Sequence, residues 1–178
     1  MKTETTTADR IADYLVWSAH DSGSFISNLK LQKLLYYVQA WHLAIFERPL
    51  FPEKFEAWVH GPVIPDIYRR FSDYQWRPID LEVQRPQLTP GTVAFIEEVL
   101  DEYGPLDARR LEYLTHRETP WIEARGGLSQ DEPCHAVISE ETMRSCYRLR
   151  LTEAEIKEII GDEPEPVADC PVPILQDV

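Results

Sequence analysis

The fold is decided by residues 27–45, which read SNLKLQKLLYYVQAWHLAI. Counted from Leu31, the apolar residues recur at offsets of 3, 4, 7, 10 and 14, the spacing of one helical face. Ser27 or Asn28 is the expected N-cap of this helix. Pro49 is expected to end it, because a proline ring cannot continue the hydrogen-bond ladder. The spacing therefore predicts a long helix, the strongest helix prediction in the chain.

Outward from this helix, the chain carries further signals of helical structure. Residues 7–20 show helical periodicity, and Asp107 and Ser139 are typical N-caps before apolar positions. Pro65, Thr89-Pro90 and Thr119-Pro120 each indicate a helix start with proline in the first turn. Thr152 and Glu155 form a capping-box pattern before Ile156, Ile159 and Ile160. We therefore predict a mostly α, single compact domain of about six to seven helices.

Two short segments have the alternating pattern of strands. Residues 55–59 and residues 79–83 each alternate apolar and polar side chains, and Gly61-Pro62 is a turn signal. The two segments are expected to pair as one small two-stranded β element.

The composition divides the chain into residues 1–161, the predicted domain, and residues 162–178, the predicted tail. The tail contains four prolines, five acidic residues and no cation. Such a segment cannot bury enough apolar surface to offset the entropy of ordering, so we predict that it is disordered on its own.

The charge and the cysteines limit the classes of partner and the cellular location. The 178 residues include 18 Lys and Arg against 31 Asp and Glu, a formal net charge of −13. This excess makes nucleic acid and anionic membranes poor partners and favours a basic partner, or simply solubility. The polar start and the lack of a long apolar run predict neither a secretory signal nor a membrane span. Three cysteines without a CxxC pair indicate a reducing cytoplasm.

No pattern of catalytic or metal-binding residues emerges from the sequence. The chain has no GxSxG, GxxxxGK[ST] or GxGxxG motif, and Cys134, His135 and Cys146 fit no zinc spacing. His42 lies near the apolar stripe and is interpreted as a core or boundary residue. We therefore predict a protein that is not an enzyme and that needs no cofactor or metal.

A partner-binding surface is the remaining functional hypothesis from the residues. Long amphipathic and aromatic side chains are typical anchors of protein interfaces. Lys30, Lys33 and Tyr37 share one flank of the helix at 31–45, although a partly buried tyrosine and two snorkelling lysines explain them equally well. The predicted contact residues are Lys30, Lys33, Tyr37, Trp41, His60 and Pro62.

Four ordered motifs carry a resemblance to a known family. They are residues 27–37 with 39–42, residues 49–51 (PLF), residues 56–65 (EAWVHGPVIP), and Thr115-His116 followed by Thr119-Pro120-Trp121. Over about residues 8–150 the chain resembles the Panacea, or SocA-like, antitoxin domains. The resemblance implies a mostly helical protein of toxin–antitoxin operons and prophages. Members of that family neutralise unrelated toxins, including nucleotide-pyrophosphate synthetases, and one branch delivers its toxin to an ATP-dependent protease.

Three hypotheses follow, and the sequence leaves the oligomeric state undetermined. In the first, the protein is an antitoxin that binds and blocks a toxin encoded beside it. In the second, it is an adaptor that feeds the toxin to an ATP-dependent protease, with the tail or the polar N-terminus as tether. In the third, which the net charge disfavours, a basic patch of Arg69, Arg70, Arg77 and Arg85 binds DNA.

Overall fold

The computed structural model describes residues 2–152, 155, 156 and 158. The predicted tail at 162–178 and the end of the last predicted helix, Ile159 and Ile160, lie outside the described residues. The described part contains the helices α1 (Ala8–Asp21), α2 (Asn28–Phe46), α3 (Pro65–Arg70), α4 (Pro90–Tyr103), α5 (Ala108–Thr115), α6 (Thr119–Arg125) and α7 (Glu140–Arg148), a 3₁₀ turn η1 (Ser72–Tyr74), and the strands β1 (Glu56–Trp58) and β2 (Gly61–Val63). The predicted mostly helical fold is confirmed.

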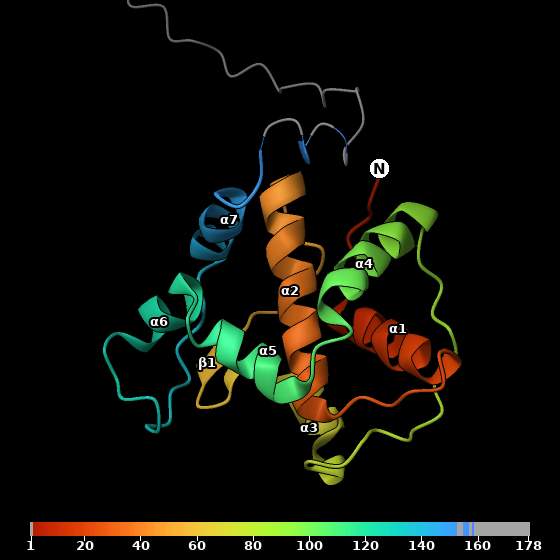
Figure 1. The fold of residues 1–178 in the computed structure, drawn as a ribbon, viewed down its shortest axis with the longest axis horizontal. Helices are drawn as coiled ribbons and strands as arrows, with labels where there is room; N and C mark the ends of the chain where they lie inside the picture. The colour runs from red at the N-terminus through yellow and green to blue at the C-terminus, as the bar shows by residue number, and fades with distance from the viewer. Residues whose placement is uncertain (1, 153–154, 157, 159–178) are drawn as a thin grey trace, which may run out of the picture.

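Helix α2 runs through the middle of the molecule (Figure 1). It packs against α7, α4, α5, α1 and β2, so that side chains on nearly every side of the helix are covered. Fifteen of its 19 residues are buried, including the polar Gln32, Lys33, Gln39 and His42. The sequence predicted a helix with one apolar stripe, but the apolar elements around α2 bury its other faces as well.

Side-chain caps fix the start of most helices, and all of these caps except Thr7 were predicted from the sequence. The hydroxyl of Ser27 accepts a hydrogen bond from the backbone N–H of Lys30, at the start of α2. The same arrangement occurs at the starts of four other helices, where the caps are Thr7, Thr89, Asp107 and Ser139. Helix α6 differs, because Glu118 rather than Thr119 occupies the N-cap position and makes no side-chain cap bond.

The two strands form a hairpin whose pairing differs from the predicted one. Strand β1 pairs antiparallel with β2, with Ala57 opposite Pro62, so Gly61-Pro62 lies in a strand rather than in the turn. The amide of Ala57 donates to Ala136, on the other side of β1, so the missing N–H of Pro62 costs this pair no hydrogen bond. Residues 79–83 form no strand, and Ile79 instead donates its N–H to Ile26.

The N-terminal residues pack onto the domain. The side chain of Thr3 is buried, and Thr6 donates its N–H to Leu50. At Gly91, a Cβ atom would lie 1.8 Å from the backbone oxygen of Lys2, so the absence of a side chain lets this segment cross the start of α4. The described part of the N-terminus is therefore integrated into the fold, unlike the tether that the adaptor hypothesis allowed.

The described part of the chain ends with the predicted capping box. The hydroxyl of Thr152 accepts from the N–H of Glu155, and the Glu155 carboxylate accepts from the N–H of Thr152.

Among the helices that the structure describes, none has the length and apolar character needed to cross a membrane.

Candidate partner-binding site

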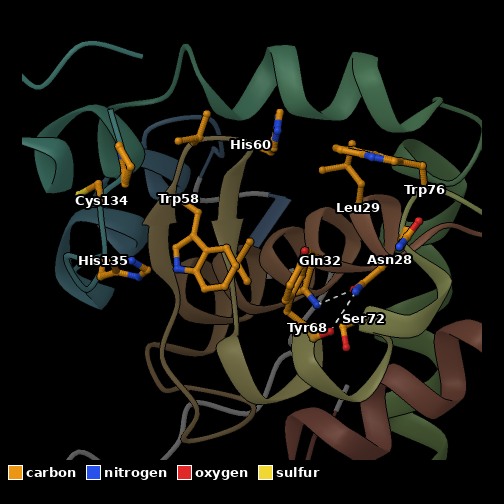
Figure 2. Close-up of a pocket in the computed structure, with 14 residues that line it drawn as sticks. Asn28, Leu29, Gln32, Trp58, His60, Tyr68, Ser72, Trp76, Cys134 and His135 are labelled. Atoms are coloured by element: carbon orange, nitrogen blue, oxygen red, sulfur yellow. Dashed lines mark hydrogen bonds between the residues drawn. The ribbon is translucent and has the colours of Figure 1, made fainter. Parts of the chain in front are cut away.

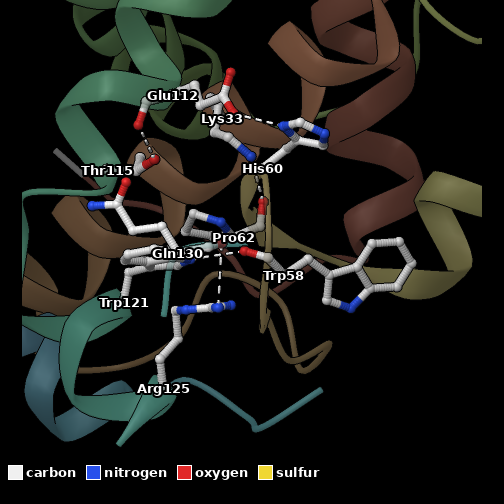
Figure 3. Close-up of polar contacts among 9 residues, drawn as sticks. All are labelled: Lys33, Trp58, His60, Pro62, Glu112, Thr115, Trp121, Arg125 and Gln130. Carbon is white, nitrogen blue, oxygen red and sulfur yellow. Dashed lines mark hydrogen bonds and ion pairs between the residues drawn. The ribbon is translucent and has the colours of Figure 1, made fainter. Parts of the chain in front are cut away.

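Three of the four sequence motifs come together at Lys33, because Lys33, Pro62 and Thr115 each belong to a different motif. Its side chain is fully buried, and its Nζ donates a hydrogen bond to the carbonyl oxygen of Pro62, 3.0 Å away (Figure 3). Lys33 comes from α2, Pro62 from β2, and Thr115 of α5 lies beside them. The prediction of Lys33 as part of an exposed flank is wrong, because the hairpin and α5 cover this face of α2.

Gly61 permits this close packing. It has a φ of +93°, and a Cβ atom there would lie 2.7 Å from Cε of Lys33 and 2.8 Å from Oγ1 of Thr115. A side chain at this position would meet both a backbone penalty and a steric clash. The glycine of the motif is therefore required by the contact between α2, β2 and α5.

Burial also changes the acid–base behaviour of Lys33. Loss of hydration lowers the pKa of its amino group to about 7, and the nearby carboxylate of Glu112 opposes part of this shift. Burial therefore favours the neutral amine, which can donate a hydrogen bond to the Pro62 carbonyl in either protonation state.

His60 is the predicted contact residue that remains at the surface of the hairpin. Its Nδ1 lies 2.7 Å from Oε1 of Glu112, and its side chain is more than half exposed. Pro62, two residues further, is buried within β2. His60 is therefore accessible to a partner, whereas Pro62 is buried and is not accessible, contrary to expectation.

The back of the hairpin is held by α6. Trp121 donates its indole N–H to the carbonyl of Trp58 at 3.0 Å, and His116 stacks on the Trp121 ring at 4.2 Å. The guanidinium of Arg125 lies over the same ring and donates to the carbonyls of Ala57, Ser129 and Glu132. The sequence analysis missed Arg125, since the carbonyls it binds belong to no side-chain pattern.

A surface pocket of about 410 Å³ opens beside the hairpin (Figure 2). Residues of α2, the hairpin, α3, η1 and the segment before α7 line it. They are Asn28, Leu29, Gln32, Trp58, Val59, His60, Val63, Tyr68, Ser72, Gln75, Trp76, Pro133, Cys134 and His135. Of the six predicted contact residues, His60 alone is among them. The volume lies within the range of roughly 300–1,000 Å³ that is typical of ligand pockets.

The side-chain amides at the base of the pocket already form hydrogen bonds within the protein. Asn28 donates to the carbonyl of Tyr68, and its oxygen accepts from Gln32. The oxygen of Gln32 accepts from the N–H of Ile64. These bonds join α2 to the start of α3 and fix the floor of the pocket. The aromatic rim, formed by Trp58, His60, Tyr68, Trp76 and His135, therefore provides most of the surface available to a partner.

The other predicted contact residues share one flank of α2, as expected, but the end of α4 covers that flank. Lys30 is half-buried and donates from Nζ to the carbonyl of Gly104 at 2.6 Å. Tyr37 is buried and stacks on Tyr103 at 3.8 Å, so its prediction as exposed is wrong. Trp41 donates its indole N–H to the hydroxyl of Tyr103. The six residues therefore do not form one surface.

A buried carboxylate lies near Trp41 and Tyr37. Glu118 accepts a hydrogen bond from the hydroxyl of Tyr147 at 2.7 Å and forms an ion pair with Arg150 at 3.3 Å. Burial raises the pKa of Glu118, and these partners partly counteract the rise. Burial likewise raises the pKa of Tyr147 well above its usual value. The cluster joins α6 to α7.

His42 has the structural role that the sequence suggested. Its Nδ1 lies 2.7 Å from the carbonyl oxygen of Arg48 and therefore carries the proton, so Nε2 accepts from the hydroxyl of Thr3 at 2.7 Å. Burial lowers the pKa of His42 to about 4. Within residues 2–152, 155, 156 and 158, no group of three or more His, Cys, Asp or Glu side chains is placed to hold a metal ion.

The arginines of the DNA-binding hypothesis are engaged within the protein. Arg69 pairs with Asp66, and Arg70 pairs with both Asp9 and Asp13. The guanidinium of Arg77 donates to the carbonyl of Asp73, and that of Arg85 lies over the ring of Trp17. Much of the charge of the expected basic patch is therefore offset locally by carboxylates.

Comparison with known proteins agrees with the motifs. The family model described as antitoxin SocA-like, Panacea domain, matches residues 31–122, a shorter range than the 8–150 over which the motifs suggested a resemblance. The antitoxin SocA of Caulobacter vibrioides (strain NA1000 / CB15N) is 29% identical over 150 residues, covering 77% of this chain and 80% of that protein. No solved structure matches the chain.

The matched range contains most of α2, the hairpin and α5, which are the elements that meet at Lys33, and it also includes the start of α6. It also contains nine of the pocket-lining residues, from Gln32 to Trp76. Because this match extends over more than half of the sequence, the chain belongs to the SocA-like Panacea domain family of antitoxins.

Proposed function

We propose that this protein is the cytoplasmic antitoxin of a toxin–antitoxin system and neutralises a toxin encoded beside it by direct protein–protein binding. The observation that carries the proposal is the family match over residues 31–122. The relative from Caulobacter vibrioides, which is named an antitoxin, supports the same role. The excess of carboxylates would speed association with a basic toxin surface.

We further propose that neutralisation requires no reaction catalysed by the protein. The pocket combines an aromatic rim with amides that already bond to one another, an arrangement suited to binding a partner's side chains. The contact surface of this proposal is therefore the pocket with His60, in place of the helix flank that included Lys33 and Tyr37.

Co-expression with the neighbouring gene tests the proposal. The toxin gene alone should arrest growth, and the full-length protein should restore growth and elute with the toxin as one complex. Continued arrest in the presence of abundant folded protein would contradict the proposal. A toxin that remains at full level but silent indicates blockade by binding.

The adaptor hypothesis gives a different result in the same experiment. Delivery to an ATP-dependent protease would shorten the half-life of the toxin, and only in cells that contain the protease. A gel shift with the upstream DNA at physiological salt tests the regulator hypothesis, which specific retardation of that DNA would support.

A further inference from the structure

The rings around the pocket hold one another in place. Trp58 makes edge-to-face contacts with Tyr68 and His135, at centroid distances of 5.0 and 5.6 Å. On another part of the rim, His60 and Trp76 meet at 5.3 Å with their planes at 89° (Figure 2). Such contacts restrict ring orientation, so the aromatic faces are preorganised before a partner arrives.

One edge of the rim has two features that lower the stability of the folded protein. Trp76 leaves 69% of its surface exposed to water. The preceding residue, Gln75, has a φ of 53° and a ψ of −115°, a backbone conformation that favours glycine. The strained Gln75 places Trp76 beside His60 with most of the indole left in solvent, and backbone strain combined with an exposed aromatic ring is a pattern expected of a binding site.

The charges around the pocket select the kind of partner. The lining contains no Lys, Arg, Asp or Glu. Its two histidines, His60 and His135, each contact a carboxylate outside the lining. Glu112 contacts Nδ1 of His60, and Glu56 contacts Nδ1 of His135 at 2.9 Å. Each of these histidines is therefore backed by a carboxylate, which adds negative potential on that side of the pocket and favours a cation over an anion.

From this combination we infer that the pocket receives an arginine side chain of the partner protein, which in the proposed function is the toxin. A guanidinium is planar and stacks on indole and phenol faces such as those of Trp58, Tyr68 and Trp76. Its N–H groups can also donate to Nε2 of the rim histidines. A carboxylate or phosphate would instead meet the field of Glu56 and Glu112. The inference rests on the proposed function for the identity of the partner.

Peptides test the pocket chemistry without the toxin. The probe is the blocked pentapeptide Gly-Gly-Arg-Gly-Gly, titrated into the full-length protein while the five indole N–H resonances are followed by NMR. The signals of Trp58 and Trp76 should shift, and that of the buried Trp121 should not. The same peptide with citrulline, a neutral group of the same shape, should bind at least tenfold more weakly.

Equal binding of the arginine and citrulline peptides would overturn the inference, because the charge would then play no part. Tighter binding of a norleucine peptide would overturn it in favour of an apolar occupant. An absence of shifts at Trp58 and Trp76 would overturn it as well.

A matched pair of variants locates the site. Trp76→Ala removes an exposed indole from the rim, and we expect it to weaken binding of the arginine peptide at least fivefold. Ile122→Ala removes an exposed apolar side chain of α6 that does not line the pocket, and it should leave the affinity unchanged. Equal affinities of the two variants would contradict the assignment, and circular dichroism verifies that both are folded.

Co-expression separates this inference from the proposed function. If the wild-type protein restores growth and Trp76→Ala does so at a much higher dose only, both stand. If the two proteins restore growth at equal doses, the antitoxin role stands, but the toxin does not bind at the arginine pocket. If the wild-type protein fails to restore growth, the proposed function falls, and the peptide titration alone decides the chemistry of the pocket.

Discussion

The amino group of Lys33, in the second turn of α2, donates a hydrogen bond to the carbonyl oxygen of Pro62 in β2, 3.0 Å away. The contact joins the central helix to the hairpin whose turn carries His60. The Lys33 side chain fills the space beside Gly61, so this pair contributes to the position of the hairpin on α2. The pocket wall formed by Trp58 and Val59 follows from the same contact.

The stability of the protein should depend on the protonation of Lys33. Its pKa is about 7 in the folded protein and 10.5 in an unfolded chain, so between these values the unfolded state binds more protons. The free energy of unfolding should therefore rise with pH in this window, by up to about 1.4 kcal/mol per pH unit. Urea denaturation of the wild type and of Lys33→Met at pH 7, 8 and 9 measures the effect. Parallel pH dependences of the two proteins would contradict it.

Gly61 should tolerate substitution far less than a glycine of similar backbone conformation in open space. Gly127 has a φ of +88°, and a Cβ atom added there would meet no atom within 4 Å, whereas at Gly61, with a φ of +93°, it would meet three atoms inside 3 Å. We expect Gly127→Ala to cost about 1 kcal/mol, from the backbone alone. Gly61→Ala should cost about 3 kcal/mol or more, because overpacking is added. Equal melting temperatures would show that the close contact is unimportant.

Loss of Arg125 should loosen the loop between α6 and α7. Replacement by Met keeps the packing on Trp121 but leaves the carbonyls of Ala57, Ser129 and Glu132 without this donor. We expect a loss of about 3 kcal/mol of stability, and faster proteolysis within residues 126–135. The control, Arg144→Met, removes an exposed ion pair with Glu141 and should leave both measurements unchanged. The prediction fails if the two variants behave alike.

Acid should weaken the attachment of the N-terminal segment through His42. The folded pKa of about 4 lies below the ordinary 6.5, so the folded state resists protonation that the unfolded state accepts. This contribution is complete above pH 6.5 and falls as the pH drops toward 4, amounting to about 2 kcal/mol between pH 6.5 and 4.5. Unfolding curves of the wild type and of His42→Gln give the comparison. A variant that loses as much stability as the wild type in this range would disprove the role of His42.

Most helices could be predicted because their signals are local. The cap at Ser27 joins atoms three residues apart, and the apolar repeat of α2 is set by the geometry of a single helix. The motifs that indicate the family can likewise be read from short stretches. The start of α6 was misplaced by one residue because Glu118, its actual N-cap, is engaged by Tyr147, 29 positions away.

The candidate site could be predicted only in part, at His60. Lys33 and Tyr37 were expected on an exposed flank, since helical periodicity shows which positions share a face but not how many faces are covered. Trp76 carried no signal, because its exposure and its position beside His60 depend on the strained turn at Gln75.

By itself the sequence determined the helical character, the caps, the acidic charge and the family, because each of these depends on composition or on interactions between residues close along the chain. The tertiary structure alone decided that α2 is buried on nearly every side, that β1 pairs with β2, and that a pocket forms beside the hairpin. Those features depend on contacts such as Glu56 with His135, 79 residues apart, whose geometry only the packing of the whole domain establishes.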